Sequence, residues 1–305
     1  MGGTGTDYFP KATPELEELV KKELEKATNE RLNIEINQLI RSKLPLFERD
    51  FPKINSYLDN INEILKDELE LERFLFGGSV SKHTYIEGLS DIDALVILSK
   101  DEYKNISPKD VLKKLEKLLK DNLFRDKVLE IRRGTLAITI EYTDNTQIQL
   151  LPAIREKEKI LIPRSNSSEW KETNPQKFKS DLTKLNQDLN NVLVPIIKLS
   201  KLIIANLPST KQLTGYHIES LAVEAFENYS GEKTPKSMLI NMFSKSANRI
   251  LSPIQDVTGQ SRIVDEYLGK ENSEQRQNIS NTLEGIVRKM ENAKSVNDWE
   301  LLLEL

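Results

Sequence analysis

The spacing of apolar residues changes twice along this chain of 305 residues, and no other feature constrains its fold as strongly. Up to about residue 69, leucines and isoleucines recur at helical spacing, whereas short β-prone apolar runs prevail between residues 74 and 151. Beyond about Lys157 no convincing strand pattern returns, and helical spacing continues towards the C-terminus. The sequence therefore predicts an α+β fold in which a small mixed sheet is followed by an all-helical half.

The expected elements divide the chain into two lobes, an α/β core with N-terminal helices over residues 1–156 and a helical domain over residues 157–305. The first long helix starts near Pro14, a break near Asn29 is considered, and Pro152 is expected to close the sheet. Strands are predicted at 74–76, 94–98, 128–132, 136–142 and 147–151, and the later helices at about 175–189, 191–206, 216–228, 235–249, 274–292 and 295–303.

Composition limits the ligands and the location that we expect. The chain has no cysteine and two histidines, so a bound metal should be a hard ion with oxygen ligands, Mg²⁺ or Mn²⁺. No signal peptide is evident and no apolar run is long enough to span a bilayer, so we expect a cytoplasmic protein without a membrane partner. The net charge of −4 gives no strong case for binding duplex nucleic acid.

A pair of acidic residues and a glycine turn form the most informative stretch. Asp91 and Asp93 open an apolar strand, and because side chains alternate along a strand, both carboxylates should point to one face. Carboxylates held so close repel each other unless a cation lies between them, which favours a divalent metal site. Upstream, Gly77-Gly78-Ser79 can bring backbone amides and a hydroxyl to phosphate oxygens. We therefore predict Asp91 and Asp93 as metal ligands and Gly78 and Ser79 as phosphate-binding residues.

This order of strand, Gly-Ser turn, spacer and Asp-x-Asp resembles the signature of the DNA polymerase β-like nucleotidyltransferase superfamily. Residues 193–203 and 215–221 are similar to the helical region of the oligoadenylate synthases and of the bacterial second-messenger oligonucleotide synthases, the cGAS/DncV-like or CD-NTase group. The resemblance implies that Lys201, with Lys198 one turn before it, contacts the nucleotide triphosphate and that Tyr216 lines or stacks on the base. The simpler alternatives are lysines on a solvated helix face and a core tyrosine with a hydrogen-bonded hydroxyl.

One position departs from the pattern of this group. Where these enzymes usually supply a third acid before Pro-Ala, the chain has Gln149. A carboxamide oxygen can ligate Mg²⁺, but it brings no negative charge and cannot act as a base. Depending on the register of the hairpin that contains it, Glu141 would lie directly across from Gln149 and partly substitute for the missing acid.

The resemblance implies a template-independent nucleotidyltransferase that makes a cyclic or linear oligonucleotide second messenger from nucleoside triphosphates, for a separate effector in antiphage defence. Asp91, Asp93 and Gln149 would be its catalytic residues. Two alternatives stay open. In the first, the nucleotide would be transferred to RNA or to a protein side chain, as in toxin-type terminal nucleotidyltransferases. In the second, the chain would be a nucleotide-binding pseudoenzyme, because Gln149 replaces the third acid.

Overall fold

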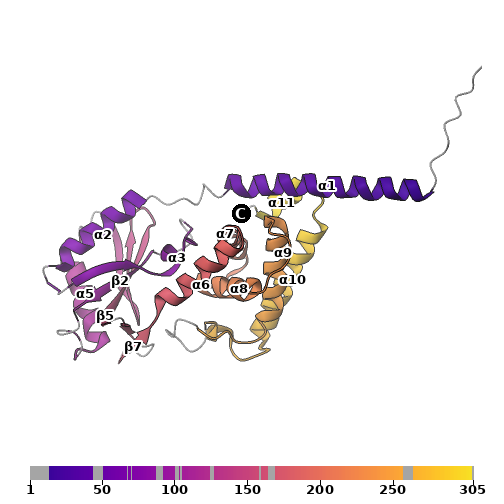
Figure 1. The fold of residues 1–305 in the computed structure, drawn as a ribbon. Helices are drawn as coiled ribbons and strands as arrows, with labels where there is room; N and C mark the ends of the chain where they lie inside the picture. Colours follow the sequence, from indigo (N-terminus) through magenta and orange to yellow (C-terminus); the bar gives the residue numbers. More distant parts are fainter. Residues whose placement is uncertain are drawn as a thin grey trace, which may run out of the picture.

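The computed structural model describes residues 14–43, 51–66, 68–69, 71–86, 92–99, 103, 105–123, 127–157, 159–163, 169–256 and 264–303. Asp91, one of the two predicted metal ligands, lies outside the described residues. Figure 1 shows a sheet with its covering helices beside a bundle of helices, as the predicted α+β fold requires. Among the described helices, none combines the length and the apolarity that crossing a membrane demands.

Within the described residues, seven strands form one mixed sheet of order β1-β2-β5-β4-β3, and β6 and β7 extend it from β5. The strands are β1 (Leu71–Phe76), β2 (Ile92–Leu98), β3 (Val128–Arg133), β4 (Ile138–Tyr142), β5 (Gln147–Glu156), β6 (Lys159–Pro163) and β7 (Trp170–Thr173). Strands β2 and β5 run parallel, and the other paired strands run antiparallel. The long strand β5 therefore lies at the centre of the sheet.

Half of the described α-helices begin directly after a residue whose side chain caps the first turn. The described α-helices are α1 (Pro14–Lys43), α2 (Phe51–Lys66), α3 (Gly78–Ser81), α5 (Pro108–Asn122), α6 (Pro175–Asp188), α7 (Leu193–Ala205), α8 (Gly215–Phe226), α9 (Pro235–Arg249), α10 (Glu274–Asn292) and α11 (Val296–Leu303). Side chains that accept a backbone N–H in the first turn cap α5, α6, α8, α9 and α10; they are Ser107, Asn174, Thr214, Thr234 and Ser273. The helices predicted after residue 174 are confirmed within a few residues at each end.

The sheet has one fully apolar face and one divided face. Helices α2 and α5 cover the first face (Figure 1), where Ile148 and Leu150 of β5 pair with Ile140 and Ile138 of β4 in a buried core. On the opposite face a smaller core contains Leu95, Ile97, Ala153 and Ile162. At the other end of the same strands, that face carries the polar side chains of Asp93 and Gln149. Because side chains alternate along β2 and β5, the larger apolar core lies on one face of the sheet, and Asp93 and Gln149 lie on the other.

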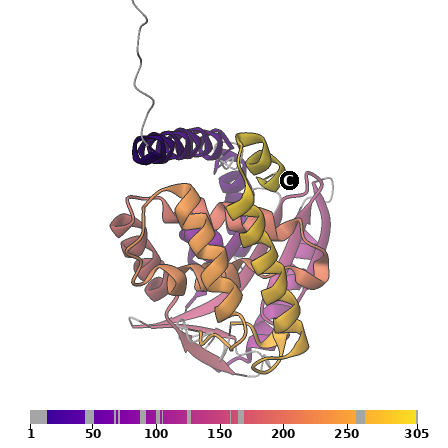
Figure 2. The same ribbon diagram turned by 90° about the vertical axis from the view of Figure 1, so that its right-hand side faces the viewer.

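The helical half has its own core, built from α6 to α11 with the C-terminal half of α1. In both views α1 passes over this half, and Figure 2 shows α9 and α10 side by side. Three elements pack with the other half from the one that a boundary at residue 156 would give them. Helix α1 contacts α9 and α11, and the strands β6 and β7 belong to the sheet.

Three details of the sequence-based prediction are wrong. Helix α1 is continuous through Asn29. Strands return after Lys157, because β6 and β7 are too short to show a clear alternation. Pro152 does not end β5, since the pairing with β4 stops at Leu150 and the pairing with β6 starts at Ile154. The proline, which lacks an N–H, lies in the gap between these two partners.

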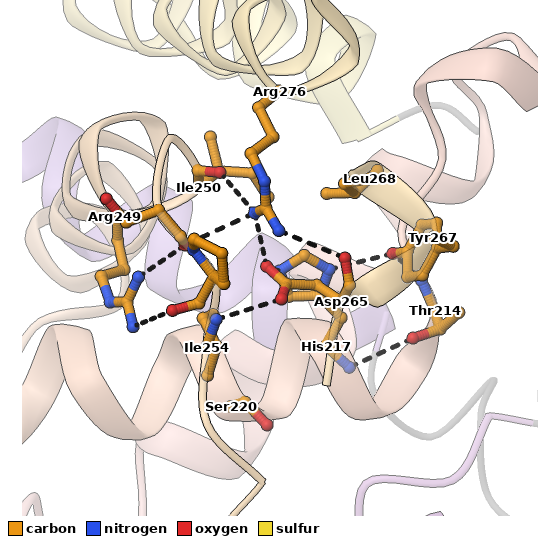
Figure 3. A network of polar contacts seen from close by, with 12 residues as sticks. Thr214, His217, Ser220, Arg249, Ile250, Ile254, Asp265, Tyr267, Leu268 and Arg276 are labelled. Carbon is orange, nitrogen blue, oxygen red and sulfur yellow. Dashed lines mark hydrogen bonds and ion pairs between the residues drawn. The ribbon is translucent and has the colours of Figure 1, made fainter. Parts of the chain in front are cut away.

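A buried polar network holds the helical half together (Figure 3). The guanidinium of Arg276 donates to Asp265 Oδ2 at 2.6 Å and to the carbonyl of Ile250 at 2.8 Å. The other oxygen of Asp265 accepts the backbone N–H of Ile254 at 3.0 Å. His217 on α8 lies 2.9 Å from the Tyr267 hydroxyl through Nδ1 and 3.5 Å from Asp265 through Nε2. The network therefore joins α8 and α10 to the connecting segment after α9.

The buried position of His217 predicts a stability that depends on pH. Burial lowers the pKa of His217 to about 4, so unfolding takes up a proton wherever the pH lies between that value and the ordinary pKa of about 6.5. The contribution of the neutral, buried His217 to the free energy of unfolding is complete above pH 6.5. It falls by up to about 3 kcal/mol as the pH is lowered towards 4. Urea unfolding of the wild type and of His217→Asn across this range should show a shallower pH slope in the variant.

The matched control is His83→Asn, which changes the only other histidine of the sequence. This variant should keep the slope of the wild type. An unchanged slope in His217→Asn would contradict the assignment.

Candidate active site

The glycine turn after β1 lies directly against Asp93. The backbone N–H of Gly77 donates to the Asp93 carbonyl at 2.9 Å. Gly78 has a φ of +46°, and a Cβ added there would lie 1.6 Å from Asp93 Oδ2. Only glycine fits this position, because both the backbone conformation and the carboxylate exclude a side chain. The structure thus brings the predicted phosphate-binding turn and one predicted metal ligand together, at the start of helix α3.

Gln149 stands beside Asp93 on the neighbouring strand. The parallel register of β2 and β5 pairs Asp93 with Gln149, and the antiparallel register of β4 and β5 pairs Gln149 with Thr139. Residues paired in this way point to the same face of a sheet. The side chain at the position where the sequence comparison leads us to expect a third acid is therefore next to the Asp93 carboxylate.

The hairpin register does not place Glu141 opposite Gln149. Glu141 pairs with Gln147 instead, and its carboxylate lies 3.5 Å from the guanidinium of Arg132. The register is set by the apolar side chains on the other face, since a shift of one residue would move them all out of the core. The predicted role of Glu141 as a direct substitute for the third acid is thus not supported by this register.

Lys201 reaches the same region from the helical half. Its side chain is 3% exposed, and Nζ donates to the Thr84 carbonyl at 2.9 Å and to Glu219 Oε1 at 2.8 Å. Thr84 follows α3, and its backbone N–H donates to the Ser79 carbonyl at 3.0 Å. The alternative of a solvated lysine is excluded for Lys201, which is connected through one residue to the phosphate-binding turn.

A second lysine shares the carboxylate of Glu219. Lys82 Nζ lies 2.5 Å from Glu219 Oε2, and the hydroxyl of Thr84 also donates to Glu219. Glu219 is 1% exposed, and the charges of Lys201 and Lys82 hold its pKa below the usual range although burial alone would raise it. Burial lowers the pKa of Lys201, an effect that the charges of Glu219 and Asp93 oppose. We call Lys82, Thr84, Lys201 and Glu219 the lysine cluster.

The lysine cluster joins the two halves and keeps a surplus of positive charge. Lys82 and Thr84 come from the segment after β1, whereas Lys201 and Glu219 come from α7 and α8. Two ammonium groups face one buried carboxylate, which leaves one cation uncompensated within the cluster. Such a charge beside a glycine turn and a helix start suits a phosphate group.

Lys82 and Glu219 were not among the residues predicted from the sequence. Lys82 is four residues after Gly78, and Glu219 lies in α8 between Ile218 and the pair Leu221-Ala222. A lone acid within a buried helix face is a signal in itself, because burying an unpaired charge is costly. It indicates that a partner exists, but it does not say which lysine provides it.

Tyr216 and Lys198 border this region. The Tyr216 hydroxyl donates to Asp256 at 2.7 Å, and its ring meets Phe178 edge to face with centroids 5.2 Å apart. Lys82 Nζ is 5.0 Å from the centroids of both rings, within the range of a cation–π contact. Lys198 is half-buried on α7, one turn before Lys201. The predicted contacts of both residues with a nucleotide remain predictions.

The described donors suit a hard cation. Asp93 offers a carboxylate and Gln149 a carboxamide oxygen, both of which are ligands for Mg²⁺. In the part of the chain that the structure describes, no three Asp, Glu, His or Cys side chains gather into a metal cluster. Asp91, two residues before Asp93, is not in that part.

Comparisons with known proteins agree with this geometry. A family model described as the Second Messenger Oligonucleotide or Dinucleotide Synthetase domain matches residues 34–186. A search of the curated proteins finds no match.

Solved structures share the fold over most of the chain. One is the CD-NTase CdnG of Bradyrhizobium diazoefficiens in complex with GTP, with 16% identity and a TM-score of 0.66 over 90% of this chain and 95% of that one. Another is CdnC of E. coli MS115-1 with ATP, with 15% identity and a TM-score of 0.63 over 83% and 91%. A third is the cyclic AMP-GMP synthase DncV of Vibrio cholerae with a linear intermediate, with 12% identity and a TM-score of 0.61 over 93% and 88%.

The close approach of Gly78 to Asp93 predicts a sharp difference between two neighbouring glycines. In Gly78→Ala the new methyl group would overlap the carboxylate, so affinity for a Mg²⁺-bound nucleoside triphosphate analogue should fall at least about tenfold. In Gly77→Ala the methyl group would lie 3.5 Å from the Asp93 Cβ, an ordinary contact, and binding should stay close to that of the wild type. Calorimetric titration measures both, and equal affinities of the two variants would refute the proposed contact.

The shared carboxylate predicts a loss of stability that a second substitution partly repairs. Glu219→Gln leaves two buried ammonium groups without their counter-charge and should lower the free energy of unfolding by about 3 kcal/mol. The double variant Glu219→Gln with Lys201→Met removes one of these ammonium groups and should recover part of the loss. Denaturant unfolding of Glu219→Gln, Lys201→Met and the double variant gives the three values, and strict additivity of the two single changes would mean that the residues do not interact.

Proposed function

Because the chain belongs to the family of second messenger oligonucleotide or dinucleotide synthetases, we propose that it is a metal-dependent nucleotidyltransferase that joins nucleoside triphosphates without a template. The product would be a cyclic or linear oligonucleotide second messenger, read by a separate effector in antiphage defence. The cytoplasm, where nucleoside triphosphates are made and used, is the corresponding location.

One observation carries this proposal: the Asp93 carboxylate lies against Gly78 and beside Gln149, next to a buried cluster that contains two lysines. A phosphate-binding turn, a metal-ligating carboxylate and cations are the parts that phosphoryl transfer requires, since catalysis depends mainly on position and charge. Asp93 with Asp91 would hold Mg²⁺ or Mn²⁺, and Gln149 would offer its amide oxygen. Such an ion neutralises phosphate charge and aligns the reacting groups.

The remaining roles belong to residues of the turn and of the helical half. Backbone amides of Gly78 and Ser79 would donate to phosphate oxygens, and the Ser79 hydroxyl would add a further donor. Lys201 and Lys198 would bind the donor triphosphate, with Lys82 contributing charge from the opposite side of Glu219. Tyr216 would line the base. Its ring is already fixed by Phe178 and Asp256, so it would need little reordering on binding.

The nucleotides found with the similar proteins support triphosphates as substrates. One of those proteins is in complex with GTP, another has ATP, and the third is a cyclic AMP-GMP synthase with a linear intermediate. These nucleotides belong to those proteins, and for this chain we propose nucleoside triphosphates as a class.

Gln149 favours a second candidate function, triphosphate binding without turnover. The carboxamide stands directly beside Asp93, where a third carboxylate would accept a proton from the attacking hydroxyl and add negative charge for the metal. A chain that lacks this group can still bind a metal and a triphosphate. The two candidates therefore differ in product formation and not in binding.

Incubation of the purified chain with all four NTPs and Mg²⁺ or Mn²⁺, followed by mass spectrometry, separates these functions. We expect small oligonucleotides from the wild type, none from Asp93→Asn, and a rate about tenfold higher in Gln149→Asp, because a carboxylate binds the metal more strongly. Glu141→Gln should resemble the wild type.

Other outcomes point to other functions. Triphosphate binding without product in both the wild type and Gln149→Asp would indicate a binding protein. Label transferred only to added RNA or protein would indicate a terminal nucleotidyltransferase.

A further inference from the structure

Helix α1 is packed at one end and uncovered at the other. Leu32 and Ile36 in its C-terminal half are buried in the core of the helical half, where the helix contacts α9 and α11. Every residue from 14 to 31 is exposed, and Figure 1 shows this end of α1 extending beyond the rest of the molecule. Most of the stability of a helix in a protein comes from packing against a partner, so an exposed half-helix gains from one.

The exposed half carries large apolar side chains. Four of them are between 51% and 63% exposed: Leu16, Leu19, Val20 and Leu24. Apolar side chains grouped on one exposed surface are uncommon in monomers and mark interaction sites. We call Leu16, Val20 and Leu24, which follow one another at steps of four residues along one face, the apolar stripe.

The apolar stripe is not a continuation of the face that packs against the core. Ile36 and Leu32 follow Val20, the centre of the stripe, by 16 and 12 residues, which at 100° per residue places them about 160° and 120° around the helix axis. The stripe therefore points away from the side on which α1 meets α9 and α11.

The pattern of the stripe is symmetric about its centre. Leu16 and Leu24 are each four residues from Val20. A twofold axis at Val20 would therefore place Leu16 against Leu24 of a second, antiparallel helix of the same sequence. An interface of this kind uses the same surface on both copies, as twofold dimers do.

The charges beside the stripe match the same arrangement. Glu17 and Lys21 follow Leu16 and Val20 on one flank of the stripe. In an antiparallel pair related by this axis, each flank meets the same flank of the other helix. Glu17 would then face Lys21 of the second copy twice, against one approach of the two Lys21 side chains to each other. On the far side of the helix, Glu18 and Lys22 form an ion pair at 2.9 Å within the helix. The solvent-facing side is thus already satisfied.

From these observations we infer that the N-terminal half of α1 is a dimerisation surface, which pairs antiparallel with the same segment of a second copy of the chain about a twofold axis at Val20. The inference is independent of the proposed catalytic function. Two such helical segments bury less surface area than a standard protein interface. We therefore expect a weak dimer, with a Kd on the order of 10 μM.

The absence of cysteine from the sequence allows a direct test of both the contact and its register. Single cysteines are introduced into the full chain as Val20→Cys, Leu16→Cys and Leu24→Cys. The control is Leu129→Cys, because Leu129 on strand β3 is at least as exposed as these residues. Under mild oxidation, Val20→Cys should form disulfide-linked dimers at least about tenfold faster than the control, because pairing raises the local thiol concentration.

The register gives a second expectation. In the antiparallel pair, two copies of residue 16 are about 12 Å apart along the axis, too far for a disulfide. Leu16→Cys and Leu24→Cys should therefore cross-link slowly when alone and rapidly when mixed. Rapid cross-linking of Leu16→Cys alone would instead reveal a parallel pair and overturn the proposed arrangement.

Sedimentation velocity provides a test without cysteines. The wild type should shift from monomer to dimer between about 1 and 100 μM, as should Leu129→Glu, whereas Val20→Glu should stay monomeric. Charge exchange sharpens the result, since Glu17→Lys or Lys21→Glu alone should weaken the dimer and the two together should restore it. A wild type that remains monomeric at 100 μM, or a Val20→Cys variant that cross-links no faster than Leu129→Cys, would refute the inference.

Discussion

The buried carboxylate of Glu219 is the interaction on which the candidate site depends. It receives Lys82 from the segment after β1 and Lys201 from α7, so one acid fixes cations from both halves of the chain. Each of these charges would be costly to bury alone, and together they leave one positive charge next to Asp93. The strand pairing of β2 with β5 provides the acidic side of the site, whereas Glu219 determines where its basic side can be.

Features determined by local sequence could be predicted, and features determined by distant partners could not. The Gly77-Gly78 turn and the strand that contains Asp93 were predicted, because glycine residues and an apolar run act over a few positions. The pairing of Lys82 with Glu219 was not, since nothing near either residue in the sequence identifies its partner. For the same reason Glu141 remained a candidate until the register of β4 and β5 placed it opposite Gln147.

Helix α1 illustrates a related limit. Its apolar residues keep helical spacing over the full length, which predicts a helix correctly, but the two halves direct them to different sides. Spacing alone does not reveal such a change, because the pattern within each half is regular. Only the position of the core shows that Ile36 packs inside the molecule while Val20 remains at the surface.

The parts of the candidate site are far apart in the sequence, and this separation affects the order in which they come together during folding. Thr84 contacts Lys201 and Glu219 across 117 and 135 residues, and Asp93 meets Gln149 through a parallel strand pair. Contacts between distant residues form slowly, because a long loop must close before they contribute. During synthesis from the N-terminus, the glycine turn and its strand exist well before the lysine cluster is complete. The ability to bind a triphosphate should therefore arise among the last steps of folding, after most of the chain has left the ribosome.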